Sequence, residues 1–151
     1  MSASSRADYL QYAVDLAVEN VQSGRGGPFA ALVVHDGAVL ATGTNRVTTN
    51  NDPTAHAEIT AIRAACEAQG DFELTGCTLF SSCEPCPMCL GAIYWTRLDR
   101  VVYAATSAQA AHAGFDDDHI YEELEKPPAA RRIPMEQHDG VAAHRPFEAW
   151  A

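Results

Sequence analysis

Residues 82–95 read Ser-Cys-Glu-Pro-Cys-Pro-Met-Cys-Leu-Gly-Ala-Ile-Tyr-Trp and, with the segments beside them, decide the fold class. The short apolar run from Cys77 to Ser81 predicts a buried strand. Glu84 to Arg97 is predicted as a helix, because proline is tolerated in a first helical turn. Val101 to Ala105 is another run of strand type. This order predicts parallel neighbouring strands, with helices covering the faces of the sheet.

The segments before this crossover predict a helix and a hairpin. Ser5 and Asp8 have the spacing of a capping box, which begins a helix. The apolar positions of this helix are Leu10, Ala13, Val14, Ala17 and Val21. Phe29 to His35 is a predicted strand, and Asp36-Gly37 is a strong turn into a second strand from Ala38 to Gly43.

A second long helix is predicted between the hairpin and the crossover. Asn45 to Asp52 is rich in Thr and Asn and is predicted as a loop, followed by a helix from Asp52 to about Gln69. The order of elements predicts a three-layer α/β/α fold on a mixed sheet. At 151 residues the chain suits one domain, residues 1–151, without disulfide bonds.

Composition and charge exclude several classes of protein. The chain is 47% hydrophobic and 20% charged, which is typical of a globular domain. No apolar stretch approaches the ~18–20 residues of a membrane span, and no secretory signal follows Met1, so we expect a cytoplasmic protein. The 10 Lys and Arg against 20 Asp and Glu give 10 − 20 = −10, which disfavours a nucleic-acid partner.

The cysteines predict a metal site. Three of the five, Cys83, Cys86 and Cys89, lie within seven residues, which in a reducing compartment favours metal binding or catalysis. Cys86 and Cys89 are three residues apart, so both face one side of a helix whose N-terminus favours thiolates. With His56 as third ligand, one Zn²⁺ per chain would keep an open fourth position, as catalytic zinc requires.

Glu58 gives this site a proton acceptor. It lies two residues from His56, and a carboxylate beside a zinc-bound water can take its proton. H-x-E followed by P-C-x-x-C is the signature of zinc deaminases. The alternative is a structural zinc with Cys83 as fourth ligand, in a binding module without catalytic activity.

Further motifs make the chain similar to the cytidine deaminase superfamily, and most similar to its bacterial guanine deaminases. The residues that carry this resemblance are 26–29, 43–45, 51–58, 82–95, 113–117 and 147–150. The resemblance implies a cytidine-deaminase-like fold with a mixed five-stranded sheet. It also implies a homodimer in which C-terminal segments are exchanged, so that each tail closes the partner's active site.

The same resemblance implies roles for individual residues. Zinc would be held by His56, Cys86 and Cys89, with Glu58 as the principal proton shuttle. The family's second catalytic carboxylate matches Asp117. The substrate-binding positions match Asn45, Phe29, Trp95 and the backbone of Ala57.

The expected reaction is hydrolytic deamination of a free nucleobase or a related amino-heterocycle, with guanine giving xanthine and ammonia. The family's C-terminal aromatic residue has no counterpart, since the sequence ends at Ala151, so modified purines, aminotriazines or cytosine analogues are further expected substrates. One alternative is a tRNA adenosine deaminase, which the negative charge disfavours. The other is the binding module without catalytic activity.

Overall fold

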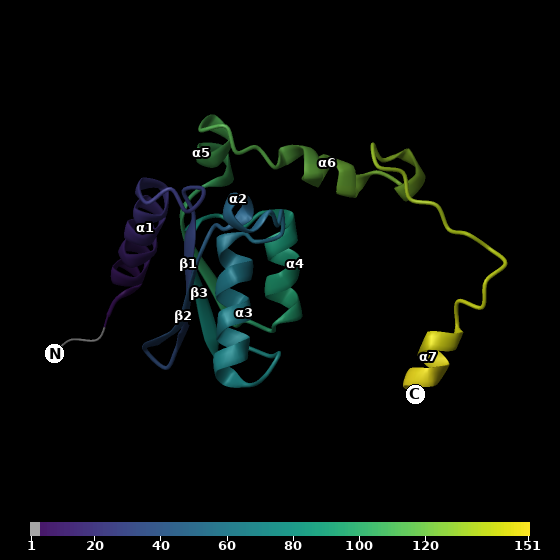
Figure 1. The fold of residues 1–151 in the computed structure, drawn as a ribbon, viewed down its shortest axis with the longest axis horizontal. Helices are drawn as coiled ribbons and strands as arrows, with labels where there is room; N and C mark the ends of the chain where they lie inside the picture. Colours follow the sequence, from purple (N-terminus) through teal and green to yellow (C-terminus); the bar gives the residue numbers. More distant parts are fainter. Residues whose placement is uncertain (1–3) are drawn as a thin grey trace. The chain divides into compact units, whose positions relative to one another are not determined.

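The computed structural model describes residues 4–151, which form two compact units divided after Asp117 (Figure 1). The larger unit contains the sheet and the helices packed on it, and the smaller unit is residues 118–151. The two are described separately below. That residues 1–151 fold as a single domain stays a prediction.

The sheet has the strand order β2-β1-β3-β4. Its strands are β1 (Ala30–His35), β2 (Ala38–Thr44), β3 (Cys77–Cys83) and β4 (Arg100–Ala105). β1 is antiparallel to both of its neighbours, whereas β3 and β4 are parallel, as the crossover predicts. β2 and β3 run in one direction but are not neighbours, because β1 lies between them. The α/β class and the mixed sheet are therefore confirmed.

The expected fifth strand is wrong for residues 4–151, where the sheet has four strands. After Ala105 the chain forms the short helix α5 (Ser107–His112) instead of another strand. The side chain of Thr106 accepts from the backbone of Gln109, whose own side chain accepts from the Thr106 backbone. This capping box begins a helix, and the segments that follow lack the apolar alternation of a strand.

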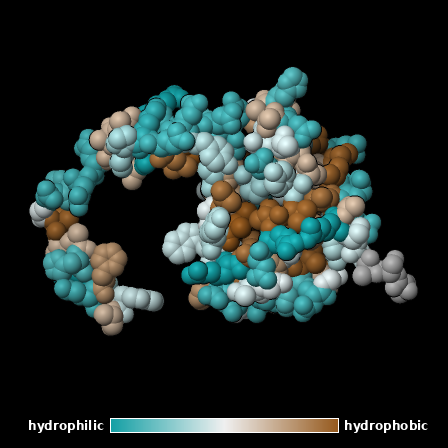
Figure 2. Space-filling model, turned by 180° about the vertical axis from the view of Figure 1, so that it is seen from behind, coloured by the Kyte–Doolittle hydropathy of each residue, from teal (hydrophilic) through white to brown (hydrophobic). Residues whose placement is uncertain are grey.

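Helices cover both faces of the sheet, as the three-layer prediction requires. On one face α1 (Arg6–Gln22) packs Tyr9 and Ala13 against β1 and β3. On the other face lie α3 (Ala57–Gln69) and α4 (Pro87–Trp95), whose buried apolar side chains form the larger core cluster with Leu74 and the strands. Figure 2 shows apolar residues gathered on the side of the larger unit that faces away from the viewer in Figure 1.

Two helices begin later than the sequence predicts. The second long helix was expected from Asp52, but α3 begins at Ala57, because the Asp52 side chain accepts from the backbone and the hydroxyl of Thr54 and holds a turn. The next helix was expected from Glu84, but α4 begins at Pro87. Proline disfavours helical backbone in the preceding residue, so Cys86 stays extended. The expected loop also contains a short helix, α2 (Val47–Asn50).

The smaller unit is built of short elements. It contains α6 (Asp118–Glu125), the 3-10 helix η1 (Pro128–Ala130) and α7 (Arg145–Trp150). None of its residues is buried, and Ile133, Phe147 and Trp150 are among its exposed apolar side chains. Within residues 4–151 no helix has the length and apolar character needed to span a membrane.

Candidate active site

The predicted site residues converge because of the strand directions. Ala30, at the start of β1, pairs with Thr44, at the end of β2, and Ala31 pairs with Ser81 near the end of β3. The start of β1 and the ends of β2 and β3 therefore lie at one edge of the sheet. Residues just outside this edge come together, although the sequence separates them widely.

Three ligand atoms meet at this edge. The Nδ1 atom of His56 lies 3.5 Å from the Sγ atoms of both Cys86 and Cys89, and all three atoms lie within 4.8 Å of one another. A tetrahedral zinc ion with ordinary Zn–N and Zn–S bonds separates a nitrogen from a sulfur ligand by about 3.6 Å. The observed spacing therefore fits zinc without rearrangement of the chain.

The backbone at two helix starts positions these ligands. His56 is the N-cap of α3 and Cys86 is the N-cap of α4, and both have extended backbone conformations. Cys89 lies three residues into α4, on the same face as Cys86. The prediction that both motifs lie at the starts of helices is correct, although these helices begin later than expected.

The ligand side chains share protons when no metal is bound. A hydrogen bond from the Cys89 thiol is the largest cause that lowers the pKa of Cys86, to about 4. The same hydrogen bond and burial raise the pKa of Cys89. The hydrogen bond with Cys86 raises the pKa of His56, against a smaller opposing effect of burial. A metal ion must therefore displace protons from this cluster when it binds.

Cys83 is not part of the ligand cluster. It is buried at the end of β3, and its sulfur lies 3.9 Å from the backbone oxygen of Thr106. Burial raises the pKa of the Cys83 thiol to about 11. The described residues thus supply three ligands to this cluster, as a catalytic site does, whereas a structural zinc site has four.

Two carboxylates lie close to the cluster. Glu58, in the first turn of α3, is 7% exposed, and burial raises the pKa of its carboxyl group against a hydrogen bond from Cys89 that lowers it. Asp117 is half-buried at the end of the larger unit. Its charge raises the pKa of His56 slightly, whereas the hydrogen bond with Cys86 is the largest cause of that shift.

Asn45 is held tightly next to the glycine loop before β1. Its backbone N–H donates to the Phe29 carbonyl at 3.1 Å, and its side-chain oxygen accepts from Val47 N at 3.2 Å. These two contacts engage the backbone N–H and the side-chain oxygen of Asn45. A Cβ atom on Gly26 would collide with the Asn45 carbonyl, so the loop can approach this closely only with glycine there.

The other predicted pocket residues have different surroundings. Phe29 contacts Phe115 edge to face, with ring centroids 5.0 Å apart. Ala57 is fully buried. Because it is the first residue of α3, its N–H has no acceptor within that helix. Trp95 is 83% exposed at the opposite end of α4 from Cys86, about 13 Å along the helix. The described chain brings the first two to the site but not Trp95.

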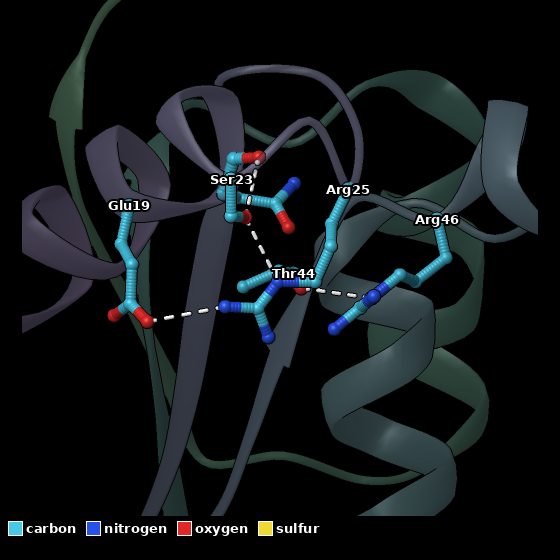
Figure 3. A network of polar contacts seen from close by, with 6 residues as sticks. Glu19, Ser23, Arg25, Thr44 and Arg46 are labelled. Atoms are coloured by element: carbon cyan, nitrogen blue, oxygen red, sulfur yellow. Dashed lines mark hydrogen bonds and ion pairs between the residues drawn. The ribbon is translucent and has the colours of Figure 1, made fainter.

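Two arginines near Asn45 are engaged within the chain (Figure 3). Arg25 donates to the carboxylate of Glu19 at 3.1 Å and to the hydroxyl of Ser23 at 2.8 Å. Arg46 donates through Nε to the hydroxyl of Thr44 at 3.1 Å.

Sequence reasoning missed Asn20, Phe115 and Glu84 as residues that shape this edge. Glu84 accepts a hydrogen bond from Ser107 N at 3.0 Å and so attaches the ligand loop to the start of α5. Phe115 lies within the motif of residues 113–117, and the resemblance implies no role for it. The one signal for Asn20 was a polar residue among the apolar positions of α1, and it is 2% exposed.

Comparisons with known proteins agree with this geometry. The family model for the cytidine and deoxycytidylate deaminase zinc-binding region matches residues 3–105. Guanine deaminase of Bacillus subtilis (strain 168) is 56% identical over 142 residues, which cover 94% of this chain and 91% of that protein. The X-ray structure of Bacillus subtilis guanine deaminase matches with a TM-score of 0.96 at 54% identity, covering 97% of this chain and 94% of that chain.

Two other relatives are less similar. A structure of guanine deaminase from Nitrosomonas europaea has a TM-score of 0.72 at 35% identity and covers 78% of this chain and 67% of that chain. A tRNA-specific adenosine deaminase of Bacillus subtilis (strain 168) is 35% identical over 106 residues, which cover 70% of this chain and 65% of that protein. The family match and the three-ligand cluster show that this chain belongs to the zinc-binding cytidine and deoxycytidylate deaminase family and is a deaminase.

Proposed function

We propose that this chain deaminates a free purine base by hydrolysis, and that guanine is a substrate, giving xanthine and ammonia. The observation that carries the proposal is the convergence of His56, Cys86 and Cys89 beside the buried carboxyl group of Glu58. The similarity to guanine deaminases over nearly the whole chain supports the choice of guanine.

His56, Cys86 and Cys89 would hold the zinc ion. Zinc in such a site supplies Lewis-acid chemistry, which turns water into a nucleophile near neutral pH. Glu58 accepts a proton from the attacking water and donates it to a ring nitrogen, while the water oxygen bonds to the amino-bearing carbon. Glu58 or Asp117 then transfers the remaining proton, from the hydroxyl group on that carbon, to the amino group. The amino group leaves as ammonia, so water is consumed and one carbonyl group is formed.

The remaining predicted residues orient the base. The NH₂ group of Asn45 donates to an acceptor on the purine edge, since its oxygen already accepts from Val47. The Phe29 ring, braced by Phe115, lies against the base, and the N–H of Ala57 donates to it. Trp95 is exposed at the far end of α4, so its contribution to a pocket requires another chain.

A free base fits this chain better than tRNA. The net charge is −10, and Arg25 and Arg46 beside the site are engaged in contacts within the chain. Binding to a polyanion requires basic groups that face outward along its path. We therefore expect no nucleic-acid partner. We also propose that the enzyme is cytoplasmic and acts on small molecules.

We further propose a homodimer with exchanged C-terminal segments. Residues 118–151 are too few to bury a core of their own, and all of them are exposed or half-buried. The exposed residues Tyr94 and Trp95 at the end of α4 give the larger unit an apolar surface as well. Apolar surfaces of this kind on both units favour association with a second copy.

Ammonia release with guanine, adenine, cytosine, an aminotriazine and a tRNA anticodon arm tests the proposal. We expect turnover with guanine that exceeds turnover with every other substrate. Faster turnover of the aminotriazine would make it the preferred substrate of the same deamination reaction. Activity on the anticodon arm alone would contradict the proposal. Sedimentation of the same sample tests the dimer, which a monomer at micromolar concentration would contradict.

A further inference from the structure

Asn20 is a buried polar residue of α1 that contacts the loop before β1 and the loop after β2. It is 2% exposed, and its Nδ2 atom donates to the carbonyl oxygen of Gly27 at 2.9 Å and to that of Asn45 at 3.0 Å. One NH₂ group therefore joins the glycine loop before β1 to the residue that follows β2. These segments are 18 residues apart in sequence, 45 − 27, and are also joined by the hydrogen bonds from the Asn45 N–H to the Phe29 carbonyl and from the Thr49 hydroxyl to the Arg25 carbonyl.

The orientation of the Asn20 amide follows from its neighbours. Both contacts are carbonyl oxygens, which only accept hydrogen bonds, so the nitrogen must face them. The oxygen, Oδ1, is then buried without a hydrogen-bond partner among the described residues. An unpaired buried carbonyl costs about 1–3 kcal/mol, so an apolar residue would suit this position better if α1 had only to pack.

The exposure of the next residue of α1, Val21, also indicates that packing alone does not explain the buried amide. Apolar spacing predicts Val21 on the buried face of the helix, but Val21 is 49% exposed while Asn20 is buried. The helix thus presents an amide to the loops and a valine to solvent. This arrangement is unfavourable for packing and favourable for holding the two carbonyl groups.

We propose that Asn20 is a positioning residue for substrate binding, because it fixes the backbone of Asn45 and so aims the Asn45 amide at the base. The inference rests on the proposed function, in which Asn45 binds the purine edge. Asn20 holds the Asn45 carbonyl, Phe29 holds its N–H, and Val47 holds its side-chain oxygen. With these three contacts in place, only the side-chain NH₂ group of Asn45 stays available to the substrate.

The test compares two substitutions that each remove a hydrogen bond from α1 to a backbone carbonyl. Asn20→Leu keeps the volume and removes the bridge near the site. Tyr9→Phe removes the bond from the Tyr9 hydroxyl to the Gly37 carbonyl, 2.7 Å long, in the hairpin turn at the opposite end of the sheet. Both zinc-loaded variants are assayed with guanine, and hydrogen exchange of their backbone amides is followed by mass spectrometry.

We expect Asn20→Leu to raise KM for guanine about tenfold, with kcat within about twofold of the wild type and one zinc per chain. Amides of residues 45–50 should exchange faster in this variant, whereas those of residues 36–38 should not. Tyr9→Phe should leave KM unchanged and speed exchange only near the hairpin. Should Asn20→Leu not fold, Asn20→Ala, which leaves room for water between the carbonyls, is measured in the same way.

An unchanged KM with unchanged exchange in residues 45–50 would overturn the proposal, as would equal losses of kcat and zinc in both variants. Failure of the proposed function has a different signature. In that case the wild type releases no ammonia from guanine, and the exchange measurement alone decides whether Asn20 positions Asn45.

Discussion

The two ends of the sheet are built in contrasting ways. At the hairpin end, Asp36 and Gly37 form a turn with positive φ angles of 49° and 77°, and the Tyr9 hydroxyl donates to the Gly37 carbonyl. At the other end, polar and sulfur-containing side chains converge, and Glu58 and Asn20 are buried there. Helix α1 is thus attached by a side chain at both ends, but only one attachment reaches residues that contact the proposed substrate.

The contrast teaches that similar hydrogen bonds serve different purposes at the two ends. A bond at the hairpin end stabilises a turn that any suitable pair of residues could form. A bond at the site end also determines where a substrate-binding group points. Substitutions at the hairpin end should therefore change stability alone, and those at the site end should also change binding or catalysis.

The largest effect is expected from Glu58→Gln. The amide keeps the size of the side chain but cannot accept the proton of water, so kcat should fall about 10³- to 10⁴-fold while zinc stays bound. Ammonia release and metal analysis measure both quantities. Glu67→Gln, on the exposed side of the same helix, is the matched control and should keep full activity. Substantial turnover by Glu58→Gln would refute its role as proton shuttle.

Loss of a zinc ligand should have the second-largest effect. Cys89→Ala leaves two of the three ligand side chains, so zinc affinity should fall by more than about 100-fold, which exceeds the usual effect of losing a residue that only supports a ligand. Competition with a chelator measures the affinity. Cys66→Ala is the control, because Cys66 lies outside the cluster near the end of α3. Full zinc content in Cys89→Ala would show that other groups bind the metal.

Glycine-to-alanine substitutions near the two ends of β2, at Gly43 and at Gly37, should differ in their effects on stability and activity. A Cβ atom on Gly43 would collide with the backbone of Ala57 and Ala61 in α3, so Gly43→Ala should cost about 1–3 kcal/mol of stability. Because Ala57 begins the helix that carries Glu58, activity should fall as well. Denaturant unfolding and the guanine assay test both effects. An active variant with wild-type stability would contradict this close approach.

Gly37→Ala should have a smaller effect, limited to stability. A Cβ atom there meets open space, but the φ angle of +77° is unfavourable for alanine, so we expect a cost of about 1 kcal/mol. KM and kcat for guanine should not change. A change in KM would show that the hairpin end is coupled to the site.

The smallest effect concerns pH and the start of α1. Hydrogen bonds from the backbone and then the hydroxyl of Ser5 lower the pKa of Asp8 below its ordinary value of 3.8. A lowered carboxyl pKa stabilises the fold above 3.8, and this stabilisation is lost as the pH falls through the folded-state pKa. The Tm of wild type should exceed that of Asp8→Ala at pH 7 and approach it below pH 3.8. A constant difference would contradict this linkage.

The ligand set could be predicted from local spacing. Cys86 and Cys89 are three residues apart, and His56 lies two residues before a carboxylate, so each half of the site is encoded within a few positions. Proline after Cys86 even encodes the start of α4, although that signal was interpreted as a helix beginning at Glu84. The hairpin was equally local, because Asp36-Gly37 specifies its own turn.

The remaining features depend on contacts between distant segments. Asn20 donates to the carbonyl groups of Gly27 and Asn45, and the sequence of α1 marks it only as a polar residue among apolar positions, without indicating these partners. The pairing of Phe29 with Phe115 follows from the path of the chain after β4. The absence of a fifth strand from residues 4–151 likewise follows from the capping box at Thr106.

X-ray absorption spectroscopy of the zinc-loaded protein counts the sulfur ligands of the metal and so distinguishes an open catalytic site from a closed structural one. We expect one zinc per chain with two sulfur neighbours, from Cys86 and Cys89, and with nitrogen or oxygen atoms in the other positions. Three sulfur neighbours, with Cys83 as the added ligand, would instead indicate a closed structural site without a position for the attacking water.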